Sequence, residues 1–444
     1  MKRVIAMSLA SVLTLGLLAG CGGNSKDNAP ATDSAETEEE STAPADSGQT
    51  AAADDGNTDG KTVVTNLSWF DTESMKELKE GFEQAYPQYE MDLQYAPPLQ
   101  QYMEKYSVLL AADELTDLYI MGPDTREEVI AYQCAEDLSD LPIMDRISDI
   151  CKRTNGDAQG HVYGLSLNAW IRGICYNIDL FEQAGIQEFP KTWDEFVDVC
   201  KTLQDNGIQP LVCGKDDLFD FAWGLYTSTE IVKDMYTDDA INNGTSTFAE
   251  KYSETFNAWY DGIVEPGYLP QSCLGLTGEQ ATDMFVNGQA AMIWEYVGNM
   301  PDYNVKNPDL KWDLKPLPGL NGESMLQGCP GVGYCVAANA KNKEGAYAYL
   351  DYVCTEEGLE QYQKATNMIM LVDGVDYELI PQIEQYRQDT IDGKYFWQTM
   401  VWEHPAAILQ AWTVGVQDVM AGTMTPDEAL ESFDAQFAEL KAAE

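Results

Sequence analysis

Aromatic side chains are the residues of this 444-residue chain whose type and surroundings most suggest ligand contacts. The chain has 10 Trp, 24 Tyr and 13 Phe, and four of the Trp stand among polar neighbours: Trp69, Trp170, Trp294 and Trp402. A single Trp most often belongs to a core, whereas several Trp around one cleft would form flat apolar walls for a ligand. The position of these residues in the fold decides between the two.

Residues for catalysis are scarce. The chain has only two His, His161 and His404, neither at a metal-ligand spacing, and it has no G-x-S-x-G turn and no Gly-rich phosphate loop. The 74 acidic residues could supply a glycosidase pair, but so many carboxylates make no pair specific. His404 follows Glu403 and is expected to be a surface or cleft contact. We therefore predict a binding protein and no enzyme, with no metal and no cofactor.

The N-terminus has the layout of a secretory signal peptide over residues 1–20. Lys2 and Arg3 precede an apolar run at 4–18, and this run is shorter than the ~20 residues that span a membrane. LAGC at 18–21 resembles the lipobox of bacterial lipoproteins, in which the cysteine is diacylated and becomes the new N-terminus. A soluble export signal is the alternative. Because two acyl chains give stable attachment, we expect an extracytoplasmic protein anchored to the cell membrane through Cys21.

A polar segment follows the anchor. Residues 22–60 contain no Val, Ile, Leu, Met, Phe, Tyr or Trp, so the segment cannot bury enough apolar surface to fold and is predicted to be a disordered acidic tether. A flexible coil of this length reaches ~35 Å on average.

The formal net charge of the whole chain is −48, which repels phosphate backbones and excludes nucleic acid as a partner.

Nine cysteines follow Cys21. Their number is odd, no C-x-x-C pair occurs, and most have apolar neighbours, as in GICYNI. Buried free thiols fit this pattern as well as disulfides do, even in an exported protein.

Strands and helices alternate after the tether. The segments TVVTNLSWF, MDLQYA and DLYIMG are predicted strands, and ESMKELKEGFEQAYP and QYMEKYSVLLAADE are predicted helices. This order predicts parallel strands with right-handed crossovers in an open α/β layer. Ligands bind beyond the carboxyl ends of the strands in such layers. The rule indicates two groups of residues: Trp69, Phe70 and Asp71 after the first strand, and Pro123, Asp124 and Thr125 after the third.

A second α/β series begins near residue 170. Strands are predicted at RGICYN, QPLVCG, the end of QAAMIWEY, and GVGYCVAANA. Helices are predicted over DLFEQAG, PKTWDEFVDVCKTLQDNG, TGEQATDMF and KEGAYAYLDYVCTEEGLEQYQ, and the tail from Phe396 is expected to be helical. No fixed repeat period is present.

Six stretches, in this order, resemble the extracytoplasmic solute-binding proteins of ABC importers, in the sugar-binding family 1 that is related to maltose-binding proteins. They are FEQAYPQYEMDLQY, ADELTDLYIMGPD, YGLSLNAWIRGICYNIDLFEQAGIQEFPKTWDEFVDVCKTL, MFVNGQAAMIWEY, GVGYCVAANAKNKEGAYAYLDYV and VMAGTMTPDEAL. The resemblance implies a two-lobed periplasmic-binding-protein-like fold of type II, with hinge-linked lobes and three crossovers near 169, 315 and 366. Lobe 1 would comprise 61–169 and 316–365, and lobe 2 would comprise 170–315 and 366–444.

The resemblance also implies which residues face the ligand. Asp124 matches a position that often bonds sugar hydroxyls, Trp69 and Phe70 lie in the first ligand loop, and Trp170 lies at the first crossover. Glu295 follows a strand, but the cleft Trp expected two or three residues later is replaced by Val, Gly and Asn at 297–299. Trp294 or Tyr296 is therefore expected to substitute for it. The remaining candidates are Trp223, Tyr334, Trp402 and Glu403.

The implied function is capture of a mono- or oligosaccharide by a monomer and its delivery to the permease subunits of an ABC transporter. Trp and Tyr rings would cover the apolar face of a sugar, and carboxylates would bond its hydroxyls. The same residue types suit a cationic ligand such as a polyamine or betaine. A surface-tethered glycoside hydrolase is the third alternative.

Overall fold

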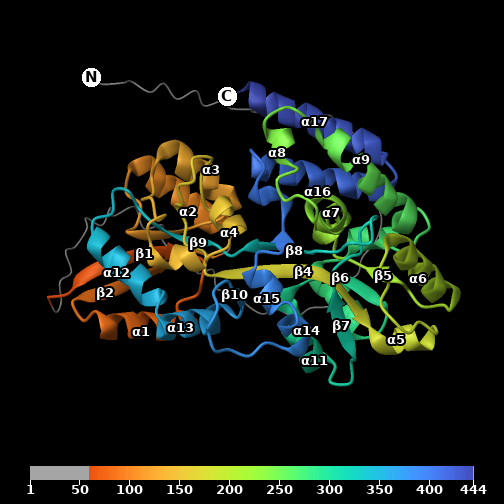
Figure 1. Ribbon diagram of the computed structural model, residues 1–444, viewed down its shortest axis with the longest axis horizontal. Coiled ribbons are helices and arrows are strands. Elements are labelled where there is room, and N and C mark those ends of the chain that lie inside the picture. Colours follow the sequence, from red (N-terminus) through yellow and green to blue (C-terminus); the bar gives the residue numbers. More distant parts are fainter. Residues whose placement is uncertain (1–59, 98, 444) are drawn as a thin grey trace, which may run out of the picture. The chain divides into compact units, whose positions relative to one another are not determined.

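Two β-sheets flanked by helices make up the part of the chain that the structure describes (Figure 1). This structure is a computed structural model, and it describes residues 60–97 and 99–443. The predicted signal peptide, the predicted anchor Cys21 and the predicted tether up to residue 59 lie outside the described residues, as does the side chain of Asp124. The described residues belong to one compact unit.

The first sheet has four strands in the order β2-β1-β3-β9. The strands β1, β2 and β3 pair in parallel, as their alternation with helices predicts, and β9 runs antiparallel to β3. Helices α1, α12 and α13 lie on one side of this sheet and α2 and α3 on the other (Figure 1). The bounds are β1 Thr62–Ser68, α1 Lys76–Ala85, β2 Tyr89–Tyr95, α2 Leu99–Ala112, β3 Leu118–Met121, α3 Pro123–Tyr132, α4 Asp149–Thr154, β9 Gly333–Val336, α12 Lys343–Val353 and α13 Glu356–Thr366.

The second sheet has seven strands around the long central strand β4. The strands β6, β7, β8 and β10 pair antiparallel with β4, while β5 pairs in parallel with β6 and β11 in parallel with β8. The bounds are β4 Asn168–Asn177, β5 Leu211–Val212, β6 Met292–Tyr296, β7 Trp312–Lys315, β8 Leu326–Pro330, β10 Ile369–Met370 and β11 Tyr395–Phe396.

Helices cover both faces of the second sheet. Figure 1 shows α7, α9, α16 and α17 together on one face and α5, α11 and α14 on the other. The first group packs around aromatic side chains that are fully buried, including Trp223, Trp402 and Trp412. The bounds are α5 Ile178–Gln183, α6 Trp193–Asp205, α7 Leu218–Tyr226, α8 Asp239–Asn242, α9 Phe248–Trp259, α10 Gly278–Val286, α11 Tyr303–Lys306, α14 Pro381–Glu384, α15 Arg387–Ile391, α16 Pro405–Ala421 and α17 Pro426–Ala442. Short 3₁₀ or π turns lie at Pro142–Arg146, Lys215–Asp217, Thr227–Ile231, Tyr260–Val264, Gln271–Gly275, Val297–Asp302 and Gln398–Met400.

Two helix predictions need correction. The single helix predicted over 343–363 is divided into α12 and α13, because the Thr355 hydroxyl accepts the Gly358 N–H at 3.1 Å and so caps a new helix. The tail is not helical from Phe396, since Tyr395–Phe396 forms β11 and a 3₁₀ turn follows. The sequence prediction also missed β8, whose LQGCP segment has no polar-apolar alternation because all five residues are buried.

Close packing between α7 and β6 leads to a stability prediction. A Cβ atom at Gly224 would lie 2.6 Å from Cη2 of the Trp294 indole, closer than van der Waals contact allows. We expect Gly224→Ala to destabilise the fold by about 1–3 kcal/mol through overpacking, measured as a lower thermal midpoint. Gly275→Ala is the control, because no atom lies within 4 Å of a Cβ there. Equal midpoints for the two variants would contradict the packing of α7 on Trp294.

None of the helices within residues 60–97 and 99–443 is long and apolar enough to cross a membrane.

All nine cysteines after Cys21 are free thiols, and seven of them are buried. Burial raises the pKa of several of these thiols, for example that of Cys151 to about 12. Their role is therefore apolar packing.

Candidate functional site

Three aromatic side chains with partly open surfaces meet on the second sheet. Trp170 on β4 lies edge-on to Tyr296 at the end of β6, with ring centroids 5.9 Å apart, and edge-on to Trp397 after β11, with centroids 5.3 Å apart. All three side chains are half-buried. We call Trp170, Tyr296 and Trp397 the aromatic trio. Half-buried rings retain a surface that a ligand ring can cover.

Strand register brings the trio together. Arg172 is paired with Tyr296 across β4 and β6, and Trp170, two residues earlier, shares the face of Arg172. On the other side of β4, Arg172 is paired with Gln327 of β8, which is in turn paired with Phe396 of β11. The segment after β11 therefore arrives beside Trp170.

An ion-pair cluster lies under the trio. Arg172 Nη1 donates to Asp217 Oδ1 and to Asp220 Oδ2, both at 2.6 Å, and Trp397 Nε1 donates to Asp220 Oδ1 at 2.6 Å. Burial opposes the charge of Arg172, but Asp220 and Asp217 outweigh it, so the pKa of the guanidinium is raised. Burial also raises the pKa of Asp220, to about 6, against the opposing effects of Arg172 and of the Trp397 N–H.

The two predicted aromatic residues of the first sheet lie just beyond the end of β1. Trp69 and Phe70 are half-buried, and Trp69 packs edge-on against Tyr102 with ring centroids 5.1 Å apart. In the β1–β3 register Leu67 is paired with Tyr119, so the loop after β1 lies at the same sheet edge as the start of α3. Asp124 is in the first turn of α3. The loop after β1 and the start of α3 therefore lie together beyond the carboxyl ends of the strands, where the strand-end rule places a ligand.

Four aromatic candidates lie in the core. The list is Trp223, Trp294, Trp402 and Tyr334, each 0–3% exposed. Trp294 stacks on Phe221 with centroids 5.3 Å apart, and the Trp402 N–H donates to Asp238 at 2.9 Å. A side chain with no open surface cannot stack a ligand in this conformation, so the structure gives these four a packing role in place of the predicted ligand role. Of the two residues expected to replace the cleft Trp that this sequence lacks, only Tyr296 has a partly exposed ring.

Glu295 is also internal. It is paired with Gly173, one residue away from Arg172 on β4, so its side chain points to the opposite face of the sheet from the trio. Its carboxylate accepts hydrogen bonds from Thr282 Oγ1 at 2.7 Å, Tyr303 Oη at 2.9 Å and Asn299 Nδ2 at 2.9 Å. These bonds satisfy the buried charge, and we correct the predicted ligand role of Glu295 to a structural one.

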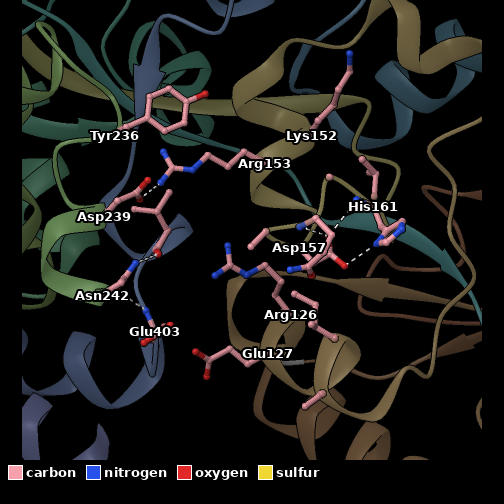
Figure 2. A pocket seen from close by; sticks show the side chains of 18 residues that line it. Arg126, Glu127, Lys152, Arg153, Asp157, His161, Tyr236, Asp239, Asn242 and Glu403 are labelled. Atoms are coloured by element: carbon pink, nitrogen blue, oxygen red, sulfur yellow. Dashed lines mark hydrogen bonds and ion pairs between the residues drawn. The ribbon is translucent and has the colours of Figure 1, made fainter. Parts of the chain in front are cut away.

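A pocket of about 980 Å³ lies between α3 and α4 on one side and α8 and the 401–403 segment on the other (Figure 2). Glu403, the last of the predicted residues, lines this pocket and forms an ion pair with Lys441. His161 also lines it, and the hydrogen bond that this imidazole donates to the Asp157 carboxylate raises the pKa of His161. We call this cavity the α3–α8 pocket.

Contacts across the α3–α8 pocket link the two sheets. Arg153 pairs with Asp239, as Figure 2 shows, donates to the Met235 carbonyl at 2.9 Å and stacks over the ring of Tyr236 at 4.3 Å. The Glu127 carboxylate accepts the backbone N–H of His404 at 2.7 Å. Each of these charges has a protein partner, so the pocket offers a ligand few unpaired groups.

Sequence reasoning missed Arg172, Asp220 and Trp397. Trp397 stands in YFWQTM between residues that are buried, and its partner Asp220 is 177 positions away. The signal that was available is the polar Arg172 within the apolar strand segment WIRGICYN, because a charge there needs buried partners. In the described part of the chain no three His, Cys, Asp or Glu side chains are grouped as a metal site.

The two sheets, the helices on their faces and the chain crossings between them define a two-lobed α/β fold of type II. A family model of the bacterial extracellular solute-binding proteins matches residues 71–360, and the chain belongs to this family. This family consists of binding proteins.

Individual relatives agree with this assignment. A Brucella abortus protein described as a binding protein is 27% identical over 290 residues, which are 63% of this chain and 67% of that protein. A family 1 extracellular solute-binding protein from Bifidobacterium longum subsp. infantis is similar in structure, with a TM-score of 0.76, 26% identity, and coverage of 86% of this chain and 100% of that one. The solute-binding protein RafE in complex with raffinose shares the fold, with a TM-score of 0.68, 18% identity, and coverage of 86% and 100%.

Proposed function

We propose that the protein is the lipid-anchored substrate-binding component of an ABC importer, and that it captures a mono- or oligosaccharide between its lobes. The observation that carries this proposal is the aromatic trio above the cluster of Arg172, Asp217 and Asp220. Three half-buried rings supply a surface for the C–H face of a sugar, and the partly exposed side chains of Arg172 and Asp217 beside them can bond hydroxyls. RafE, a neighbour in fold, binds raffinose, which supports a carbohydrate ligand.

The cluster favours a neutral sugar over a cation. The Arg172 guanidinium lies 5.9 Å from the ring centroid of Trp170 and 5.9 Å from that of Tyr296. A protein cation thus already occupies the electrostatic position that an aromatic cage would offer to an ammonium group. An ammonium ligand would have to displace Arg172 from these rings, whereas a hydroxyl oxygen could accept a hydrogen bond from the guanidinium.

The hydrolase alternative finds little support in the same cluster. Asp217 and Asp220 are neighbouring carboxylates, but both accept hydrogen bonds from Arg172 Nη1 at 2.6 Å. A general acid and a nucleophile need to reach the scissile bond from two sides, and carboxylates tied to one guanidinium nitrogen do not offer this.

We propose lobe boundaries that follow the sheets. The first and third crossings stay near the predicted positions, before β4 and between α13 and β10. The second crossing is proposed between β8 and β9, at 331–332, because β8 pairs with β4 and β11 and belongs with the second lobe. The predicted position near 315 would separate β8 from these partners.

Membrane attachment gives a separate prediction for Cys21. We expect wild-type protein to sediment with the membrane and to label with palmitate, and Cys21→Ser to give a protein that does neither, because one thiol carries the acyl chains. The measurement is radiolabelled palmitate incorporation with cell fractionation. Cys354→Ser, which removes a partly exposed thiol from the folded part, is the control and is expected to stay anchored. Equal labelling of wild type and Cys21→Ser would refute the anchor.

The sugar assignment is tested by ligand-induced thermal stabilisation of residues 61–444. The panel contains raffinose, stachyose, xylo- and chito-oligosaccharides, spermidine and glycine betaine. We expect at least one saccharide to raise the unfolding temperature in proportion to ln[ligand], since a ligand stabilises the state that it binds. A shift with spermidine or betaine alone would favour a cationic ligand, and release of reducing ends from an oligosaccharide would favour a hydrolase.

A further inference from the structure

Asp220 connects three segments that are far apart in the sequence. It lies in the first turn of α7, is 2% exposed, and uses one oxygen for Arg172 of β4 and the other for Trp397 after β11. Both bonds are 2.6 Å long. Because the two donors bind different oxygens, the carboxylate fixes their positions relative to each other.

Both partners of Asp220 touch the aromatic trio. Trp397 is itself a member of the trio and lies edge-on to Trp170 with centroids 5.3 Å apart. Arg172 lies 5.9 Å from the ring centroids of Trp170 and Tyr296. All three rings are therefore either held by Asp220 directly or in contact with a group that Asp220 holds.

We propose that Asp220 is a positioning residue for the ligand: its carboxylate holds Trp397 and Arg172 in the arrangement that presents the aromatic trio, so that ligand affinity depends on the charge of Asp220. The proposal rests on the proposed function for the ligand itself. Asp220 is too deeply buried to touch a ligand and acts through Trp397 and Arg172.

The groups around Asp220 set the pH at which its charge changes. Arg172 faces it from β4, Asp217 from the preceding 3₁₀ turn and Cys213 from the segment after β5, while Glu295 and Tyr296 of β6 act on Arg172. Burial raises the pKa of Asp220 to about 6, with Arg172 and the Trp397 N–H acting in the opposite direction. Asp220 is thus ionised at pH 7.5 and protonated at pH 5, where it loses the charge-assisted bonds to both partners.

Stability and affinity should respond to pH with opposite signs. A carboxyl group whose pKa is raised by folding binds more protons in the folded state, so its contribution to stability is present below about pH 4 and is lost as pH rises through about 6. Affinity should instead rise over the same interval, because the ionised carboxylate positions the trio. If Asp220 had only a structural role, affinity would change with pH in the same direction as stability.

The test compares Asp220→Asn with Asp216→Asn in protein 61–444. The control removes an exposed carboxylate that pairs with Lys215, and it leaves both partners of Asp220 in place. The first readout needs no ligand: the indole ¹⁵N–¹H resonance of Trp397, assigned with Trp397→Phe, is followed from pH 5 to 7.5. We expect it to shift with a midpoint near 6 in the wild type and in Asp216→Asn, and not to shift in Asp220→Asn.

The second readout is calorimetric affinity for raffinose, or for the panel saccharide with the largest thermal shift. Wild type and Asp216→Asn should bind about tenfold more weakly at pH 5 than at pH 7.5, whereas Asp220→Asn should bind weakly at both, since charge-assisted bonds are roughly twice as strong as neutral ones. An indole resonance that does not titrate, or equal affinities and pH profiles for Asp220→Asn and wild type, would overturn the proposal. If no saccharide binds, the proposed function fails, and the indole titration alone still decides whether Asp220 positions Trp397.

Discussion

Trp170→Ala is expected to weaken saccharide binding about 10- to 100-fold, because covering an aromatic side chain contributes about 1.5–3 kcal/mol. Trp170 is the central member of the trio and touches both other rings. The variant should remain folded, since the side chain is half-buried and its loss leaves no closed cavity. Calorimetric titration of wild type and variant with the same saccharide measures the change.

Tyr236→Ala is the matched control for this prediction. Tyr236 is an aromatic residue of the second lobe that is 51% exposed and lines the α3–α8 pocket, where it packs against Arg153. We expect its removal to change affinity by less than about threefold. A large loss for Tyr236→Ala together with unchanged affinity for Trp170→Ala would move the ligand from the trio to the α3–α8 pocket.

Asp238→Ala is expected to produce a large loss of stability. The Asp238 carboxylate is fully buried and accepts hydrogen bonds from Tyr226 Oη at 2.7 Å, Tyr252 Oη at 2.7 Å and Trp402 Nε1 at 2.9 Å. Burial raises the pKa of Asp238, and these three donors act against that rise. Truncation leaves three buried donors without an acceptor, each costing about 1–3 kcal/mol.

We expect the free energy of unfolding to fall by at least about 3 kcal/mol and the thermal midpoint by about 5 °C or more. Urea unfolding followed by tryptophan fluorescence is the measurement. Asp234→Ala serves as the control, because Asp234 is an exposed carboxylate in the same loop and its loss should cost no more than about 0.5 kcal/mol. A stability loss no greater than that of the control would show that the three donors find other acceptors.

Much of the first lobe can be predicted from sequence because its signals are local. The alternation in TVVTNLSWF and the helical spacing after it produce β1 and α1, and the strand-end rule leads to Trp69 and Phe70. The two lobes and the family follow from the order of short motifs, which the comparisons confirm. The split between α12 and α13 was not predicted, because a single Thr N-cap starts a new helix within a segment whose apolar residues keep a helical spacing throughout.

Burial of individual aromatic residues could not be predicted in this way. Trp402 in VWEHP is next to Glu403, and Trp223 in DFAWGLY lies three residues after Asp220, yet both indoles are 0% exposed. A polar residue near a Trp in sequence is therefore no sign of an open ring, since Asp220 itself is buried and bonded to Arg172 and Trp397. Tyr296 and Trp294 could both be proposed from sequence as substitutes for the missing cleft Trp. The choice between them depends on α7, because Phe221 of this helix covers Trp294.

A crystal structure of residues 61–444 with the saccharide that gives the largest thermal shift tests the central claim most directly. We predict that one sugar ring lies against Trp170, with Tyr296 and Trp397 also within van der Waals distance. Trp69 or Phe70 should approach the same saccharide from the other lobe. Density for the saccharide in the α3–α8 pocket, with the trio uncovered, would contradict the account.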